Sequence, residues 1–346
     1  MNHKRQANMR DVAELAGVSI SSVSNYTNER WQRLSVEKRK TIAEAIASLG
    51  YRVNNPARSL RSSRTKTLGL LVLDDTYRFL ADPLTGLYLA GIMDSAREKG
   101  YSVLVHASGS RHKRDEMLLP IAENRVDAAC VLLSGARAMR KRILQGLGKS
   151  GIPLVVFDET DTMDAAPRAH SVRADQESGA SSLVHHLIQK GHTDIAFIAA
   201  KSPWAVLEQR YDSFKRTMRD HSIKINPDWV RFEGDWTPDS ARPIVETLLS
   251  RPRRPSAIVC GSDLLAIGAM RTVTEQKLSV PNDVAIAGFD DFDFSRNVSP
   301  SLTTVRVPAW EMGYAAADAL IADLAQTHYG RHSLVLETEL VIRESA

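Results

Sequence analysis

Acidic and hydroxyl side chains follow three apolar runs that have the composition of buried strands. Ser134 follows VLL, Asp158 follows VVF and Asp290 follows AGF. Open parallel sheets bind ligands beyond the carboxyl ends of their strands, so residues at these ends are candidates for one common site. Further candidates lie near other predicted strand ends or on the helices that follow them: Trp204, Arg210, Trp236 and Ser262.

Carboxylates, an arginine and aromatic rings together suit a polyhydroxylated ligand. Charged groups form bidentate hydrogen bonds with such a ligand, and aromatic faces stack on the apolar face of its ring. Asp263 is also a candidate, but it fits better as the N-cap of the helix that begins DLLAIGAM. Trp204 and Trp236 fit a core as well as a pocket. We therefore expect two or three members of the set to line one pocket.

Motifs for catalysis, nucleotide binding or metal binding find little support. Residues 148–150, GKS, resemble the end of a phosphate-binding loop, but they precede a strand, and Ile143 stands where that motif begins with Gly. No GxGxxG follows a strand, and the pair at 185–186, HH, lacks a partnered Glu or Cys. Cys130 and Cys260 lie in strand-like runs, typical of reduced packing residues. We predict no enzyme, no metal site and no cofactor.

The charge of the chain is unevenly distributed. Residues 1–66 carry 13 Lys and Arg against 5 Asp and Glu, whereas the remainder carries 32 against 36. A basic head on a mildly acidic body predicts that only the head contacts nucleic acid. No uncharged apolar run approaches the length of a membrane span, and the N-terminus has no apolar signal segment, so we expect a cytoplasmic protein without a membrane partner.

The sequence of the head predicts three short helices. Residues 9–28, MRDVAELAGVSISSVSNYTN, indicate two helices separated at Gly17, with Ser19 placed to N-cap the second. A third helix is expected over residues 36–49, between Ser35 as its N-cap and Gly50 as its stop. Their apolar spacing predicts one small core made of Val12, Leu15, Val23, Ile42, Ile46 and Leu49.

The outer face of the second helix is short, polar and free of acidic residues. It carries Ile20, Ser21, Ser22 and Asn25. A helix-turn-helix places such a face in the major groove of DNA. An ordinary helical hairpin on a globular domain is the alternative, and the basic charge around this one favours the DNA-binding interpretation.

The segment that follows the head is basic and polar apart from Leu60. Asn54-Asn55-Pro56 resembles a helix start, because Pro is tolerated in a first turn. Residues 54–66 are either a flexible linker or a segment that becomes ordered on DNA. In the second case Leu60 is an apolar wedge for a minor-groove step.

From residue 67 onwards, apolar strand-like runs alternate with amphipathic helical segments. This pattern predicts an α/β core of doubly wound parallel sheets covered by helices on both faces. The number of βα units is too large for one sheet, so we expect two similar lobes. We predict one lobe from residues 67–160 plus 308–325, and the other from residues 161–300 plus the C-terminal strand.

Over nearly its whole length the chain resembles the LacI/GalR family of bacterial transcription regulators. The motifs that carry the resemblance are, in order, DVAELAGVSISSVSNYTN, LGYRVNNPARSLRSSRTKTLGLLV, GHTDIAFIA with QRYDSF, CGSDLLAIGAM, VPNDVAIAGFDD and SPSLTTVRVPAWEMG. The family implies a helix-turn-helix over residues 1–53, a hinge helix within 54–66, and a two-lobed core over 67–346. That core is similar to periplasmic sugar-binding proteins, binds a small effector between its lobes, and dimerises.

The resemblance also implies which residues contact DNA and effector. Base reading falls on Ile20, Ser21 and Asn25, and the minor-groove wedge falls on Leu60 with Ala57 beside it. The complete DNA-contacting set that we predict is Ser19, Ile20, Ser21, Ser22, Asn25, Asn28, Ala57 and Leu60. The effector-binding set implied is Ser134, Asp158, Trp204, Arg210, Trp236, Ser262 and Asp290.

The sequence therefore predicts a sequence-specific DNA-binding regulator whose operator affinity is controlled by a sugar or sugar derivative, and we expect it to act as a repressor. The expected partners are double-stranded operator DNA, the small-molecule effector and a second copy of the chain in a homodimer. The absence of a leucine-heptad tail favours a dimer over a tetramer. A solute-binding protein of sugar uptake is the alternative that the core alone allows.

Overall fold

The computed structural model describes residues 7–28, 30–51, 64–73, 81–108, 115–159, 165–166, 168–201, 204–326 and 333–346. By its internal contacts the chain divides into two compact units, Met1–Thr65 and Lys66–Ala346. Each unit has its own hydrophobic core, and each is described by itself.

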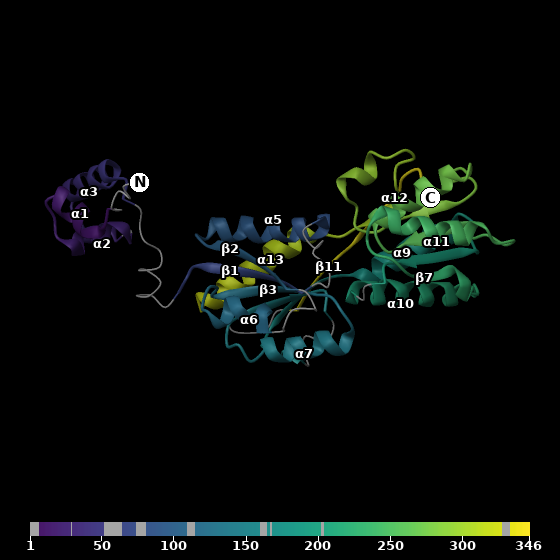
Figure 1. The fold of residues 1–346 in the computed structure, drawn as a ribbon, viewed down its shortest axis with the longest axis horizontal. Helices are drawn as coiled ribbons and strands as arrows, with labels where there is room; N and C mark the ends of the chain where they lie inside the picture. Colours follow the sequence, from purple (N-terminus) through teal and green to yellow (C-terminus); the bar gives the residue numbers. More distant parts are fainter. Residues whose placement is uncertain are drawn as a thin grey trace, which may run out of the picture. The chain divides into compact units, whose positions relative to one another are not determined.

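The first unit is a three-helix bundle (Figure 1), made of α1 (Met9–Leu15), α2 (Ile20–Thr27) and α3 (Val36–Leu49). The Ser19 hydroxyl accepts a hydrogen bond from the Ser22 N–H, and the Ser35 hydroxyl accepts one from the Lys38 N–H, which confirms both predicted N-caps. Gly50 ends α3 with a φ of 59°, a left-handed conformation that glycine adopts without strain.

The predicted core of this bundle is partly wrong. Val12, Val23 and Ile42 are completely buried, as expected, but Leu15 is 55% exposed and Leu49 is also exposed. Each of these leucines is the last residue of its helix. Helical periodicity places them on the apolar face, but periodicity does not say whether the last turn of a helix is covered.

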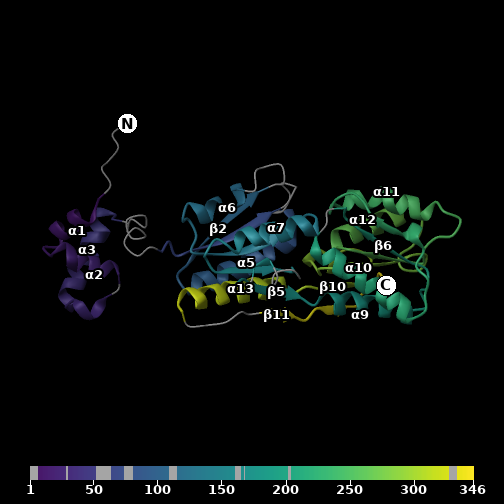
Figure 2. The same cartoon turned by 90° about the horizontal axis from the view of Figure 1, so that it is seen from below.

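The second unit begins with a lobe built on a six-stranded parallel sheet in the order β11-β5-β4-β3-β1-β2. One face is covered by α5 and α13, and the other by α6 and α7 (Figures 1 and 2). The strands are β1 (Thr67–Leu73), β2 (Ser102–Ser108), β3 (Ala128–Leu133), β4 (Leu154–Phe157), β5 (His170–Ala174) and β11 (Ser333–Leu336). The helices are α5 (Pro83–Glu98), α6 (Asp115–Ala122), α7 (Arg137–Leu147) and α13 (Ala309–Leu324).

Helices α5 and α13 approach each other closely because each has a glycine at the contact. A Cβ atom on Gly91 would lie 2.0 Å from the Trp310 carbonyl oxygen, and one on Gly313 would lie 2.2 Å from the Tyr88 carbonyl oxygen. Any larger residue at either position would force the helices apart.

The other lobe has a four-stranded parallel sheet in the order β7-β6-β8-β9. Helices α9 and α10 pack against each other beside this sheet, and α11 and α12 form a second pair (Figure 2). The strands are β6 (Ile195–Ala199), β7 (Val230–Phe232), β8 (Ala257–Cys260) and β9 (Ala285–Ala287), and the helices are α9 (Gln176–Gln189), α10 (Ala205–Asp220), α11 (Pro238–Leu249) and α12 (Asp263–Glu275). Cys130 and Cys260 are buried free thiols, as predicted.

The chain passes between the lobes in three places, and here the predicted division is wrong. Strand β5 and strand β11 both belong to the first sheet, whereas we expected residues 161–300 and the C-terminal strand in the other lobe. The C-terminal run is two strands, because β12 (Glu339–Val341) leaves β11 and pairs antiparallel with β10 (Thr304–Arg306). Strand β11 pairs with β5, which lies more than 150 residues earlier in the chain. The apolar sequence of a strand does not indicate which distant strand it will pair with.

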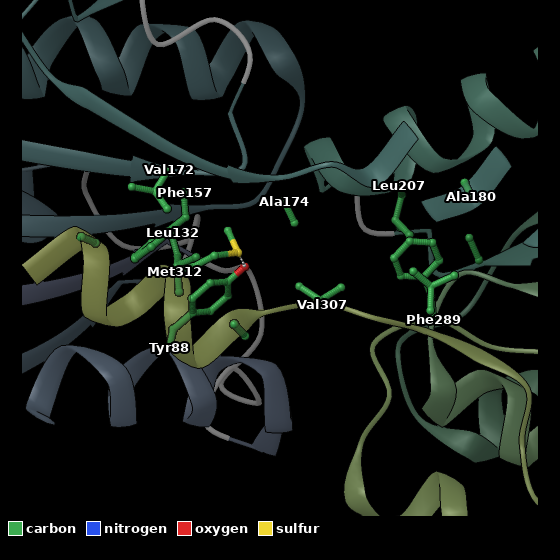
Figure 3. Packing of buried hydrophobic residues seen from close by; sticks show 14 of the residues in the cluster. Tyr88, Leu132, Phe157, Val172, Ala174, Ala180, Leu207, Phe289, Val307 and Met312 are labelled. Atoms are coloured by element: carbon green, nitrogen blue, oxygen red, sulfur yellow. Dashed lines mark hydrogen bonds between the residues drawn. The ribbon is translucent and has the colours of Figure 1, made fainter. Parts of the chain in front are cut away.

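One buried apolar cluster extends through both lobes (Figure 3). Tyr88, Phe157 and Met312 belong to the first lobe, Leu207 and Phe289 to the second. Val307 lies between the two groups, in the segment that joins β10 to α13. The lobes are thus connected by packing as well as by the three chain crossings.

Candidate functional site

A cavity that opens to solvent lies between the two lobes. Its walls come from α5 and the ends of β3 and β4 in the first lobe, and from α10, α12 and the segments before α11 and after β9 in the second. Six of the seven residues predicted to bind effector line it: Asp158, Trp204, Arg210, Trp236, Ser262 and Asp290.

The local structure explains why these residues meet. Asp158 directly follows β4, and Asp290 lies three residues after β9. Ser262 is the N-cap of α12, and its hydroxyl accepts a hydrogen bond from the Leu265 N–H. Trp204 directly precedes α10, and Trp236 lies between β7 and α11. All of them therefore sit at the carboxyl ends of parallel strands or at the starts of the helices that follow.

Arg210 is the central cation of the cavity and is only 2% exposed. Its Nη2 donates to Asp290 Oδ1 at 3.0 Å, its Nη1 to the Gly261 carbonyl oxygen at 2.7 Å, and its Nε to Gln176 Oε1 at 2.8 Å. The guanidinium plane also lies over the Phe289 ring, 3.7 Å from the ring centre. These contacts fix the guanidinium in one orientation.

Asp158 is also buried, but it accepts hydrogen bonds from uncharged donors. The Tyr88 hydroxyl donates to Oδ2 at 2.7 Å, and the Ala174 N–H donates to Oδ1 at 2.9 Å. Burial raises the pKa of Asp158, and these hydrogen bonds oppose the rise. The pKa of Tyr88 is raised well above its usual value, first by burial and then by the neighbouring Asp158 charge.

Asp290 has a pKa raised well above its ordinary range by burial, which the adjacent Arg210 partly offsets. Its backbone has a φ of 118°, a region that residues other than glycine rarely adopt. The Asp290 N–H donates to the Val305 carbonyl oxygen at 2.8 Å. A carboxylate, a fixed guanidinium and aromatic walls in one cavity can bind hydroxyl groups in a defined orientation.

The structure places Ser134 and Asp263 differently from the predictions. Ser134 is buried and is not among the residues that line the cavity; its backbone forms an isolated antiparallel bridge with Trp204 of the other lobe. Asp263 is not the N-cap of α12, because Ser262 has that role. The Asp263 carboxylate instead accepts hydrogen bonds from the Phe292 N–H and the Ser295 hydroxyl, which orders the loop after Asp290.

On the predicted DNA-contacting face, the serines bond to one another. Ser19 Oγ lies 2.7 Å from Ser21 Oγ and 3.0 Å from Ser22 Oγ, and Ser22 is buried. Ile20 is 45% exposed, and Asn25 is partly buried. The Asn28 amide donates to the Ser24 carbonyl oxygen at 2.7 Å and so caps the end of α2. Ala57 and Leu60 lie outside the described residues.

Comparison with known proteins agrees with this architecture. Residues 8–54 match the model of bacterial regulatory proteins of the lacI family, and residues 184–346 match that of a periplasmic binding protein-like domain. The repressor PurR of Aliivibrio salmonicida (strain LFI1238) is 30% identical over 342 residues, which cover 98% of each chain. The chain belongs to the lacI family.

Solved structures of lacI-family proteins have the same fold. The lac repressor dimer bound to operator and the anti-inducer ONPF is 25% identical, with a TM-score of 0.85 over 99% of each chain. The complex of the regulator CelR with cellobiose is 27% identical, with a TM-score of 0.73 over 98% of this chain and 100% of that one. This lacI-family member is accordingly a DNA-binding transcriptional regulator with a small-molecule effector, and not an enzyme.

Two observations on the described residues bear on other function classes. Within the described ranges, no group of three or more His, Cys, Asp and Glu side chains is arranged to hold a metal ion. No helix among the described residues is long and apolar enough to cross a membrane.

Sequence reasoning missed several residues that shape the cavity of this lacI-family protein. Gln176 lies shortly after a strand, so the rule that identified Asp158, a polar residue after an apolar run, could also have identified it. Tyr88 lies inside α5, where that rule does not apply. Glu159 also lines the cavity and pairs with the buried Arg140, whose Nε lies 2.6 Å from Glu159 Oε2. Arg140 Nη2 lies 3.4 Å from a carboxylate oxygen of Glu208 on α10, so this ion pair joins the two lobes.

Proposed function

We propose that this regulator is an operator-binding repressor whose effector is a sugar or sugar derivative bound in the cavity between the lobes. The observation that carries the proposal is the convergence of Asp158, Arg210, Asp290 and two tryptophans on one cavity, in a chain that begins with a helix-turn-helix. The related CelR structure contains cellobiose, which supports a polyhydroxylated ligand.

In this proposal the cavity residues have separate roles. Asp290 and Arg210 bind neighbouring hydroxyl groups, because they form a rigid pair with both hydrogen-bond acceptors and donors. The rings of Trp204 and Trp236 contact the apolar faces of the ligand. The Ser262 hydroxyl, at the start of α12, adds a further polar contact.

Effector binding is coupled to DNA binding through the relative position of the lobes. The lobes contact each other across the cavity at the Arg140–Glu208 ion pair and at the Ser134–Trp204 bridge. A ligand that fits one lobe arrangement better than another shifts the population toward it, and coupling energies of this kind are typically about 1–3 kcal/mol. By linkage, operator DNA then changes effector affinity by the same factor.

For DNA recognition we propose contacts from Ser19, Ile20, Ser21, Ser22, Asn25 and Asn28. Ile20 offers an exposed apolar contact, and Asn25 suits bidentate pairing with adenine. The hydroxyl cluster around Ser19 and the capping role of Asn28 favour backbone positioning over base reading for those residues. Ala57 and Leu60 remain proposed minor-groove contacts.

We further propose that the protein acts as a homodimer in the cytoplasm, with two heads on a pseudo-palindromic operator. The related lac repressor structure is a dimer bound to operator, which supports this arrangement. Two-fold symmetric proteins bind sites with matching symmetry, so the operator should contain two inverted half-sites.

The test is fluorescence anisotropy with labelled DNA from upstream of the genes neighbouring its own, measured with and without a panel of sugars. We expect binding that survives excess nonspecific competitor DNA and changes at least fivefold with one sugar. Arg210→Lys should keep operator binding and lose the response to that sugar. Absence of specific DNA binding under all conditions would refute the repressor function, and specific binding that no sugar alters would refute the proposed effector class.

A further inference from the structure

The cavity between the lobes is rich in carboxylates. Its described lining includes Asp82, Asp158, Glu159 and Asp290, but the single cation Arg210. Arg140 lies behind Glu159 and pairs with it. The formal charges of the described lining residues therefore sum to a negative value. A bound ligand meets the field of these residues at short range, in a partly desolvated space.

The positive charge of Arg210 is already engaged by the protein. Asp290 binds its Nη2, the Gly261 carbonyl oxygen binds its Nη1, and Gln176 binds its Nε. The Phe289 ring covers one face of the guanidinium. An anionic ligand could neutralise Arg210 only in competition with Asp290, and would then lie next to that carboxylate.

Asp158 is a buried carboxylate that no described cation contacts directly, and the charge of Arg210 acts on it from beyond ion-pair distance. Its side chain is bound by the Tyr88 hydroxyl, the Ala174 N–H and the Gln176 amide, all uncharged. Donors face both of its oxygens, an arrangement that suits an ionised carboxylate, since a protonated one must itself donate. With only 7% of its surface exposed, its charge is poorly screened by water.

We propose that this cavity selects its effector by charge: the effector carries no phosphate or carboxylate, and Asp158 is the residue that excludes such groups. A protonated amine is compatible with the same site, because it would supply a countercharge in direct contact and the cavity also has aromatic faces. The proposal rests on the proposed function of the cavity as the site for a sugar-like effector, and it narrows the chemical class of that effector.

The test uses matched sets of ligands and the full-length protein. For each of glucose, galactose, mannose and ribose, the parent sugar, an amino-deoxy derivative, the sugar acid and the terminal phosphate ester are compared by thermal shift and then by isothermal titration calorimetry. In any set that binds, we expect the parent or its amino derivative to bind at least tenfold more tightly than the acid and the phosphate.

Two results overturn the inference in distinguishable ways. If an acid or a phosphate is the tightest ligand of its set, charge selection is wrong while the sugar-binding function stands. If no member of any set binds, the proposal of a sugar-like effector is wrong, and the inference about its charge is wrong with it. The DNA-binding function is unaffected by this result, because operator binding is measured in a separate assay.

Two variants test the role of Asp158. Asp158→Asn removes the charge and can still accept the Ala174 N–H, and we expect it to reduce the discrimination against acid and phosphate at least tenfold. Tyr88→Phe is the matched control, because it removes a hydrogen bond to the same carboxylate but keeps the charge, so discrimination should persist. Unchanged discrimination in Asp158→Asn, or equal loss in both variants, would contradict the assignment.

Discussion

Replacing Arg210 by methionine removes the guanidinium but keeps an unbranched side chain of similar reach. The change deletes hydrogen bonds to Asp290, Gln176 and the Gly261 carbonyl oxygen, and it leaves the Asp290 carboxylate buried without its cation. Removing one partner of a buried ion pair typically costs about 3–5 kcal/mol. We expect the free energy of unfolding of the core to fall by that amount.

Urea unfolding followed by tryptophan fluorescence measures this loss, because the core contains Trp204, Trp229, Trp236 and Trp310. The cause can be separated with Asp290→Asn. If the uncompensated carboxylate dominates, the double variant is less destabilised than the sum of the single variants by about 1–3 kcal/mol.

The pH dependence of Arg210→Met gives a second check with a definite sign. Burial already raises the pKa of Asp290, and Arg210 opposes that rise, so its removal moves the pKa of Asp290 further up. The folded state then binds a proton more tightly than the unfolded state, and the variant regains stability as the pH falls. A loss below about 1 kcal/mol, or strict additivity with Asp290→Asn, would refute the reasoning.

Three further predictions concern other parts of the chain. Ser19→Ala removes the N-cap of α2 and should destabilise the head by about 1 kcal/mol, seen as faster amide exchange in α2, whereas Ser19→Asn should retain most protection. Asp263, whose pKa burial raises to about 6, should make the wild-type core less stable as the pH rises from about 4 to about 6, by about 3 kcal/mol. Urea unfolding at a series of pH values should show that this pH-dependent loss of stability is missing in Asp263→Asn. Leu60→Ala should weaken operator binding but not sugar binding. An unchanged operator affinity, measured by fluorescence anisotropy, would refute the proposed role of Leu60 as a minor-groove wedge.

The parts of the cavity that sequence could predict share one property: their signal is local. Asp158 and Asp290 each follow an apolar run, and the carboxyl end of a parallel strand is recognisable without knowing which strands are neighbours. The same rule brought Ser262, Trp204 and Trp236 to one place. The expectation that only two or three of the set would line the cavity was too cautious, because it treated their positions as independent.

The parts that sequence could not predict depend on pairing between distant segments. Tyr88 reaches Asp158 from inside a helix 70 residues away, and Arg140 meets Glu208 across the lobes. Asp263 looks like an N-cap locally, but it is drawn into contact with Ser295, which is 32 residues further along the chain. Helical and strand periodicity says which face of an element is apolar, and not which partner will cover it.

Backbone conformation favours aspartate at two of the buried carboxylates, Asp158 and Asp290. Asp158 has a φ of 50° and Asp290 a φ of 118°, so the chain leaves each strand through a conformation that L-residues rarely adopt. Glycine relieves this strain best but has no side chain to bind a ligand. Asp and Asn are enriched among non-glycine residues with positive φ, mostly in the left-handed region, where the φ of Asp158 falls. The Asp158 N–H donates to the Val172 carbonyl oxygen at 3.0 Å, which holds the residue in place despite the strain. The cavity is therefore shaped by main-chain geometry as well as by side-chain contacts, and asparagine is the substitution that changes the charge while keeping that geometry.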